Sequence, residues 1–91
     1  MRSAVVTLRL ELKFLVAGSC CHSLKDVRFS ELPRKGDLLP VAGGLSLKVQ
    51  EVEWTLVDGV YTPFQAELHL GPDLRGDPAL EKNLRNHGWV W

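Results

Sequence analysis

The residues with the clearest chemical capacity are Cys20, Cys21 and His22, which are consecutive. Zinc sites separate paired cysteines by about two to four residues so that both sulfurs reach one tetrahedral ion, and adjacent cysteines do this poorly. The other histidines, His69 and His87, belong to different predicted elements. We therefore predict two thiols in a loop and no metal site, with a metal site, a redox thiol or an intermolecular disulfide as the alternatives.

Catalysis by these groups would need a nucleophile, a base within hydrogen-bond reach and an oxyanion donor. Cys21 could pair with His69 or His87, but no local signature in the sequence supports either pair. The glycines also lack the spacing of a phosphate-binding loop. The sequence therefore predicts a protein that is not an enzyme and uses no cofactor.

A group of basic residues in the middle of the chain could bind nucleic acid. It comprises Arg28, Arg34, Lys35 and Lys48, with Phe29 among them. On a small barrel, such residues can bind a phosphate backbone while the aromatic ring stacks on a base. The alternative is that these residues only solvate a turn, because acidic residues nearby dilute the field.

Three tryptophans are candidates for contacts with a protein partner, namely Trp54, Trp89 and Trp91. Trp54 alternates in phase with Val52 and Leu56, which favours a place in the core. Trp91 is the last residue of the sequence. An aromatic side chain there indicates either docking on the sheet or insertion into a neighbouring molecule, since tryptophan is favoured at interfaces.

The charges balance overall but are segregated along the chain. Eleven basic and eleven acidic residues give a net charge of zero, which excludes the strongly basic balance of a DNA-coating protein. Residues 1–48 hold eight Lys/Arg against four Asp/Glu (net +4), and the remainder holds three against seven (net −4). Such a chain can fold one half onto the other or stack head to tail in an oligomer, the alternative being two mixed solvated faces.

The length of 91 residues and a hydrophobic content of 45% allow one modest core, so we expect a single domain over residues 1–91. The run from Val16 to Cys20 resembles the cleavage box of a bacterial lipoprotein, but the apolar stretch before it carries Arg9, Glu11 and Lys13. No run reaches the roughly 18 apolar residues that cross a bilayer. We therefore expect a cytoplasmic protein without a membrane segment.

The first half of the chain begins with an unusually long alternating segment. Even positions from Ala4 to Val16 are apolar and most odd positions are polar, which predicts a bent strand over residues 3–16. Residues 17–26 show no period and predict a loop, followed by a short strand at 27–29. Residues 38–41 include Pro40, which predicts an edge or a bend, and the glycines at 43–44 predict a reversal.

The second half predicts a hairpin and a helix. Residues 45–57 alternate but change phase, which predicts a bulge near Gln50-Glu51, and Asp58-Gly59 suits a tight turn into a return strand at 61–70. Asp77 and Pro78 predict the start of a helix over 78–87, and Gly88 its end. The helix is expected to dock through Leu80, Leu84 and Trp89, with Trp89 folding back on Leu84.

The turn at Gly36-Asp37, within the run from Leu32 to Leu39, leads into the bulged segment from Leu45 to Trp54 and then into a hairpin. This arrangement resembles the opening of SH3-like small β-barrel domains over about residues 27–70. The long first strand and the helical end depart from that pattern. The resemblance implies a binding module and transfers no site residues.

The sequence therefore predicts a mainly β fold: a strongly bent antiparallel sheet, or a partly open small barrel, of about five strands with one short C-terminal helix. We expect a non-catalytic protein-binding or assembly module that self-associates through strand edges, the first strand and the Pro-interrupted strands being the natural edges. The first alternative is nucleic-acid binding by the basic group. The second is a small inhibitor or immunity-type protein with an acidic face of Glu51, Glu53 and Glu67.

Overall fold

The computed structural model of the chain describes residues 6–91, which form five strands, a short 3-10 helix and one α-helix. The predicted start of the first strand, residues 3–5, lies outside this range. The elements are β1 (Val6–Val16), β2 (Ser19–Phe29), β3 (Leu38–Ala42), β4 (Leu45–Val57), β5 (Val60–Asp73), η1 (Leu74–Gly76) and α1 (Pro78–Asn86). The predicted mainly β class with one short C-terminal helix is confirmed.

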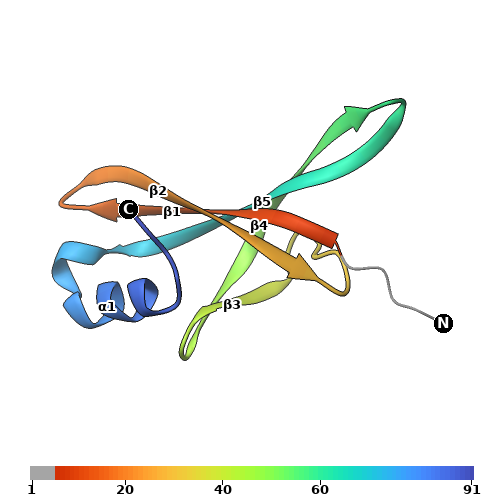
Figure 1. Cartoon of the computed structure of the whole chain (residues 1–91). Coiled ribbons are helices and arrows are strands. Elements are labelled where there is room, and N and C mark those ends of the chain that lie inside the picture. Colours follow the sequence, from red (N-terminus) through yellow and green to blue (C-terminus); the bar gives the residue numbers. More distant parts are fainter. Residues whose placement is uncertain (1–5) are drawn as a thin grey trace.

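The five strands form one sheet in the order β2-β1-β5-β4-β3, which curls into a half-barrel (Figure 1). The sheet is mixed rather than wholly antiparallel, because β1 and β5 run parallel and the other neighbours run antiparallel. A parallel pair needs a long crossover, and here β2, β3 and β4 supply it. The expectation that the first strand is an edge is wrong, since β1 lies between β2 and β5. Of the two strands that contain proline, β3 with Pro40 is an edge as predicted, whereas β5 with Pro63 lies between β1 and β4.

The predicted loop over residues 17–26 is also wrong, because most of it belongs to β2. Ala17 and Gly18 adopt positive φ angles of 50° and 79°, which form a tight two-residue turn. β2 then pairs with the whole described length of β1, from Val16 opposite Ser19 to Val6 opposite Phe29. Its inward-facing residues include Cys21, Ser23 and Lys25, and these polar types obscure the alternation in the sequence.

The core lies on the concave face of the sheet, under α1 and the C-terminal segment. The predicted apolar face of β1 is confirmed, since the even residues from Leu8 to Phe14 are buried. The rest of the cluster comes from β3, β4, β5 and the residues that cover them: Val41, Ala42, Val49, Ala66, Leu68, Leu70, Leu74, Leu84 and Trp89. Burying each such large side chain contributes roughly 1.5–3 kcal/mol, so this layer is the main source of stability.

The local features predicted for the second half of the chain are confirmed. The β4–β5 ladder shifts register between Val49 and Glu51, which is the predicted bulge, and again between Glu53 and Trp54, opposite Pro63. Asp58 and Gly59 take φ angles of 49° and 80° in the hairpin turn. The two strands therefore keep pairing up to the turn, from Val57 opposite Val60 inward.

The C-terminal helix begins and ends as the sequence predicts, to within one residue. The Asp77 carboxylate accepts a hydrogen bond from the Leu80 amide at 3.1 Å, and Pro78 is the first helical residue. Gly88 has a φ of 90°, and the Trp89 amide donates to the Leu84 carbonyl at 3.2 Å. This Schellman end turns the chain back, so that Trp89 packs against the sheet. Within residues 6–91, no helix combines the length and apolar character that crossing a membrane requires.

Candidate functional site

The part of β4 and β5 beyond the body of the sheet, residues 53–64, forms a two-stranded arm that projects outward (Figure 1). Among the described residues, β3 pairs with β4 only up to Lys48, and β1 pairs with β5 only from Gln65 onward. The arm strands therefore pair only with each other. The molecule is correspondingly elongated, with extents of 45 × 27 × 21 Å.

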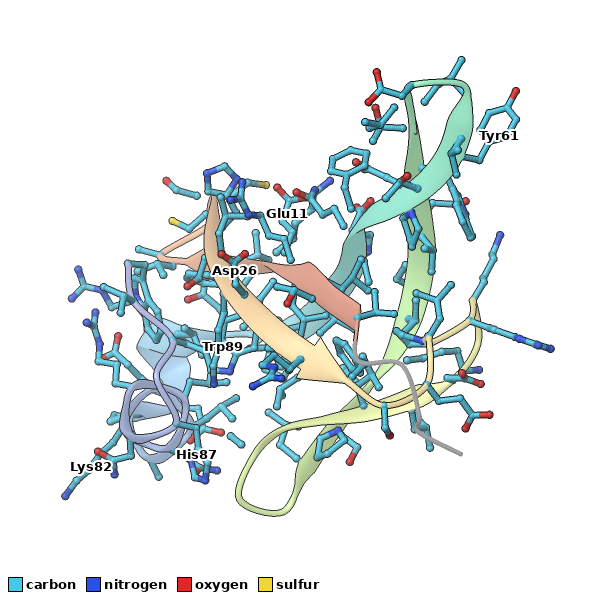
Figure 2. The ribbon with its side chains drawn as sticks, turned by 45° about the vertical axis from the view of Figure 1, so that its right-hand side comes forward. Glu11, Asp26, Tyr61, Lys82, His87 and Trp89 are labelled. Carbon is cyan, nitrogen blue, oxygen red and sulfur yellow. The ribbon has the colours of Figure 1, made fainter. Side chains whose placement is uncertain are left out.

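The arm carries an unusual number of exposed apolar side chains. Their exposed fractions run from 42% to 74%, and they are Trp54, Leu56, Val57, Val60, Tyr61 and Phe64. Figure 2 shows Tyr61 at the far end of the arm, pointing away from the ribbon, whereas Trp89 lies between the sheet and the helix. Exposed apolar side chains that gather in one part of a domain are a common feature of interaction surfaces.

Trp54 is the one predicted partner-contact residue on this arm. The expectation that it lies in the core is wrong, since its exposed fraction is 52%. Its alternation with Val52 and Leu56 does reflect a strand, but within the described residues no second layer covers this strand beyond Val52. Trp54 instead borders a groove of about 430 Å³, together with Arg34, Lys35 and Val52.

The other two tryptophans hold the C-terminal segment against the sheet. Trp89 is 2% exposed, so its predicted contact with a partner is corrected to a core position, and its indole nitrogen donates to the Val41 carbonyl at 2.7 Å. Trp91 meets the Phe14 ring edge-on at 4.8 Å between centroids. The Arg85 guanidinium lies 4.1 Å from the Trp91 ring centroid. Of the two readings of Trp91, the structure shows docking on the sheet.

The predicted nucleic-acid group does not form one surface. Arg34 and Lys35 lie together beside Trp54, but the Lys35 ammonium also lies 3.7 Å from the Glu51 carboxylate. Phe29 faces inward and packs against the core, so the expected role of its ring in base stacking is wrong. Arg28 and Lys48 are exposed on β2 and β4, which lie apart in the strand order.

The thiols and two of the histidines lie near the β1–β2 turn, at the opposite end of the sheet from the arm. Cys20, His22 and His69 border an open groove of about 550 Å³. Cys21 is half-buried, and its sulfur contacts the Ser19 carbonyl at 3.7 Å. His87 lies elsewhere, after α1, with its Nδ1 2.8 Å from the Asn83 carbonyl. No cluster suited to a metal ion occurs in residues 6–91.

A polar network on the convex face of the sheet was not foreseen from the sequence. The Glu67 carboxylate lies 2.6 Å from both the His69 Nε2 and the Lys13 ammonium. Hydrogen bonds from His69 and Lys13 hold the pKa of Glu67 below its ordinary value, and the bond to Glu67 raises the pKa of Lys13. His22 lies 3.3 Å from Glu11. The parallel pairing of β1 with β5 brings Lys13 beside Glu67 and His69, and the pairing of β2 with β1 adds His22. Neither pairing was predicted from the sequence, so the network could not be found there.

The predicted acidic face is divided between different contacts. Glu51 pairs with Lys35, whereas Glu67 belongs to the network on β1 and β5. Glu53 is half-buried at the base of the arm. The idea of an inhibitor that binds through these three carboxylates stays a prediction without a further observation in its favour.

Comparison with models of protein families, with curated proteins and with solved structures finds no match for this chain. The resemblance to SH3-like barrels therefore stays a prediction. The most distinctive part of the surface is the arm.

Proposed function

We propose that this chain is a non-catalytic protein-binding module that self-associates, and that the arm is its binding element. The observation that carries the proposal is the set of six exposed apolar side chains on a ribbon that projects from the body. An isolated two-stranded ribbon is only marginally stable in water, so covering this surface stabilises both the ribbon and the complex.

The exposed apolar residues of the arm are not part of an incompletely closed core, which supports a role in binding. The core is closed by Leu74, Leu84 and Trp89 without any contribution from the arm tip. Removal of apolar groups from residues 56 and 61 therefore costs the folded monomer little. Exposed strand edges and aromatic residues are also the features that recur where an extended segment joins a sheet.

Sedimentation velocity and light scattering at high micromolar concentration test the proposal. The unmodified chain is expected to form a dimer or a larger assembly, and Leu56→Ser/Tyr61→Ser is expected to dissociate it. Leu38→Ser/Val90→Ser is the matched control, because Leu38 and Val90 are 66% and 73% exposed outside the arm. A strict monomer at these concentrations, or equal loss in both double variants, overturns the proposal.

Nucleic-acid binding is the second candidate, and one observation favours it. Arg34 and Lys35 lie beside the half-exposed ring of Trp54, which combines cations with a stacking surface. If phosphates bind there, affinity falls steeply as salt rises, and Arg34→Glu weakens binding to every sequence alike. Absence of binding to single-stranded or duplex DNA and RNA at low salt ends this candidate.

A further inference from the structure

The β4 side of the arm lacks the features by which other edges avoid pairing with a second chain. Residues 54–57 read Trp-Thr-Leu-Val and include no charge and no proline. β3, at one edge of the sheet, contains Pro40, and β2, at the other, carries Lys25, Asp26 and Arg28. Prolines and charges are the devices that protect an edge strand, so the β4 side of the arm is the unprotected one in residues 6–91.

The register of the hairpin tells which backbone groups on this side are open. In a hairpin with a two-residue turn, the flanking pair is the hydrogen-bonded kind, and the two kinds of pair alternate along the ladder. Val57 and Val60 flank this turn, so Leu56 opposite Tyr61 is a pair of the other kind, as is Trp54 opposite Pro63. The backbone groups of Leu56 and Trp54 therefore point away from β5.

The opposite side of the arm offers fewer donors. By the same alternation, the backbone groups of Tyr61 and Pro63 point away from β4, and proline has no N–H to donate. The outward side of β5 in the arm therefore lacks one N–H donor, at Pro63. Nearer the body, loop groups already bond β4, since the Val49 amide donates to the Asp37 carbonyl at 2.8 Å. Within residues 54–57 of β4, Trp54 and Leu56 are therefore the positions with open backbone groups.

We infer that the occupant of this edge is the β4 edge of a second copy, paired antiparallel about a two-fold axis at Thr55. This inference rests on the proposed function and specifies its geometry. The register that centres on Thr55 sets Trp54 opposite the partner's Leu56 and Leu56 opposite the partner's Trp54. In this register the open backbone groups of Trp54 and Leu56 in each copy all bond to the other copy. The two-fold symmetry makes the edge complementary to itself.

The side chains agree with this register. Trp54 and the partner's Leu56 form an aromatic–aliphatic pair across the strands, a kind of pair that stabilises sheets. Glu53 comes opposite the partner's Val57 and Glu51 opposite the partner's Gly59, so that no carboxylate faces another across the new ladder. Thr55 faces its own copy, which gives a Thr–Thr pair at the axis.

Charge complementarity favours a second copy over an unrelated strand. In this register Asp58, at the tip of the arm, comes opposite the partner's Val52. Val52 borders the groove that also contains Arg34, Lys35 and Glu51, so that two cations outweigh one carboxylate there. Asp58 at the tip of each copy is thereby brought towards Arg34 and Lys35 of the other.

Disulfide cross-linking tests the edge and the register together. In a background with Cys20→Ser and Cys21→Ser, Thr55→Cys is expected to form a covalent dimer under mild oxidation, because the paired Cα atoms lie about 4.5 Å apart. Thr62→Cys is the matched control. Thr62 pairs with Thr55 within the arm, so the two copies of residue 62 are separated by three strand spacings, roughly 14 Å.

A second pair of variants tests the same edge without cysteines. Leu56→Pro and Tyr61→Pro each remove an outward N–H from one member of a facing pair. Leu56→Pro is expected to raise the dimer dissociation constant by roughly tenfold or more, since symmetry removes the donor twice, and Tyr61→Pro is expected to raise it far less. Asp58→Asn, which suits the turn, is expected to reduce the salt dependence of the dimer.

The outcomes separate this inference from the proposed function. Cross-linking at residue 55 and not at 62, together with the stronger effect of Leu56→Pro, supports the β4–β4 interface. A dimer that cross-links at 62, at neither position, or that is weakened more by Tyr61→Pro overturns the inference and leaves self-association standing. A monomer at every concentration overturns both.

Discussion

Two hairpins of this molecule have the same construction, but one is covered by other parts of the chain and the end of the other is exposed to solvent. β1–β2 and β4–β5 are both long antiparallel ribbons joined by two-residue turns with positive φ, at Ala17-Gly18 and at Asp58-Gly59. The concave face of the first is covered by the C-terminal segment. The end of the second is bare, although its side chains are the more apolar.

Hydrogen bonds between β2 and the C-terminal segment hold that segment over the first hairpin. Ser23 is 2% exposed, and its hydroxyl donates to the Val90 carbonyl at 2.7 Å and accepts from the Val90 amide at 3.1 Å. Lys25 donates to the His87 carbonyl and lies over the Trp89 ring. At the turn, the Asp73 carboxylate accepts from the Ala17 and Gly18 amides. The polar hairpin is therefore covered within the chain, whereas the apolar end of the other hairpin is exposed, and this exposed end is the surface that we propose a second copy covers.

The largest expected difference between the two regions is in the effect of removing a tryptophan. Trp89→Ala is expected to lower the free energy of unfolding by about 3–5 kcal/mol, because it opens a cavity between the sheet and α1. Trp54→Ala is the contrast, and it is expected to leave the unfolding of the monomer nearly unchanged. Urea denaturation at low micromolar protein concentration measures both variants. A similar decrease in the free energy of unfolding for the two would contradict the distinction between a core tryptophan and an exposed one.

A smaller effect is expected from the buried serine. Ser23→Ala leaves the Val90 amide and carbonyl without their partner, at a cost of about 1–3 kcal/mol. Thr62→Ala in the arm removes the hydroxyl and the γ-methyl of an exposed side chain and is expected to change the free energy of unfolding by less than about 0.5 kcal/mol. Equal stabilities of the two variants would show that the C-terminal segment does not need this contact.

The smallest expected effect is a change in the free energy of unfolding with pH, which arises from two carboxylates in the body of the domain. The pKa values of Glu67 and Asp73 are both lowered in the folded chain, the first mainly by His69 and the second mainly by the Arg75 amide. The folded state therefore binds fewer protons, and their contribution is present above the ordinary pKa values and is lost as pH falls through the folded ones. The urea concentration at the midpoint of unfolding is therefore expected to decrease as the pH is lowered below about 5. Glu67→Gln with Asp73→Asn should flatten that slope, and an unchanged slope would contradict the assignment.

Much of the fold can be predicted from the sequence, because local signals fix it. The apolar even positions of β1, the Asp58-Gly59 turn and the Asp77 and Gly88 ends of α1 all depend on residues close to one another in the chain. β2 could not be predicted, since the burial of Ser23 and Lys25 depends on a segment more than 60 residues away. Such long-range satisfaction of polar groups leaves no periodic trace.

The candidate site was harder to predict for a related reason. Alternation identifies the strand that contains Trp54, but it does not tell whether a second layer covers that strand. Leu56-Val57 and Val60-Tyr61 do place apolar residues consecutively on both sides of the turn. That pattern indicates a ribbon that is apolar on both faces, and it was the signal available for the arm.

Amide hydrogen exchange as a function of protein concentration tests the central claim most directly. The Trp54 and Leu56 amides are predicted to exchange slowly at high concentration and to lose that protection on dilution, while the Tyr61 amide exchanges rapidly throughout. Protection of Trp54 and Leu56 that is absent at every concentration, or that does not change on dilution, would contradict the account.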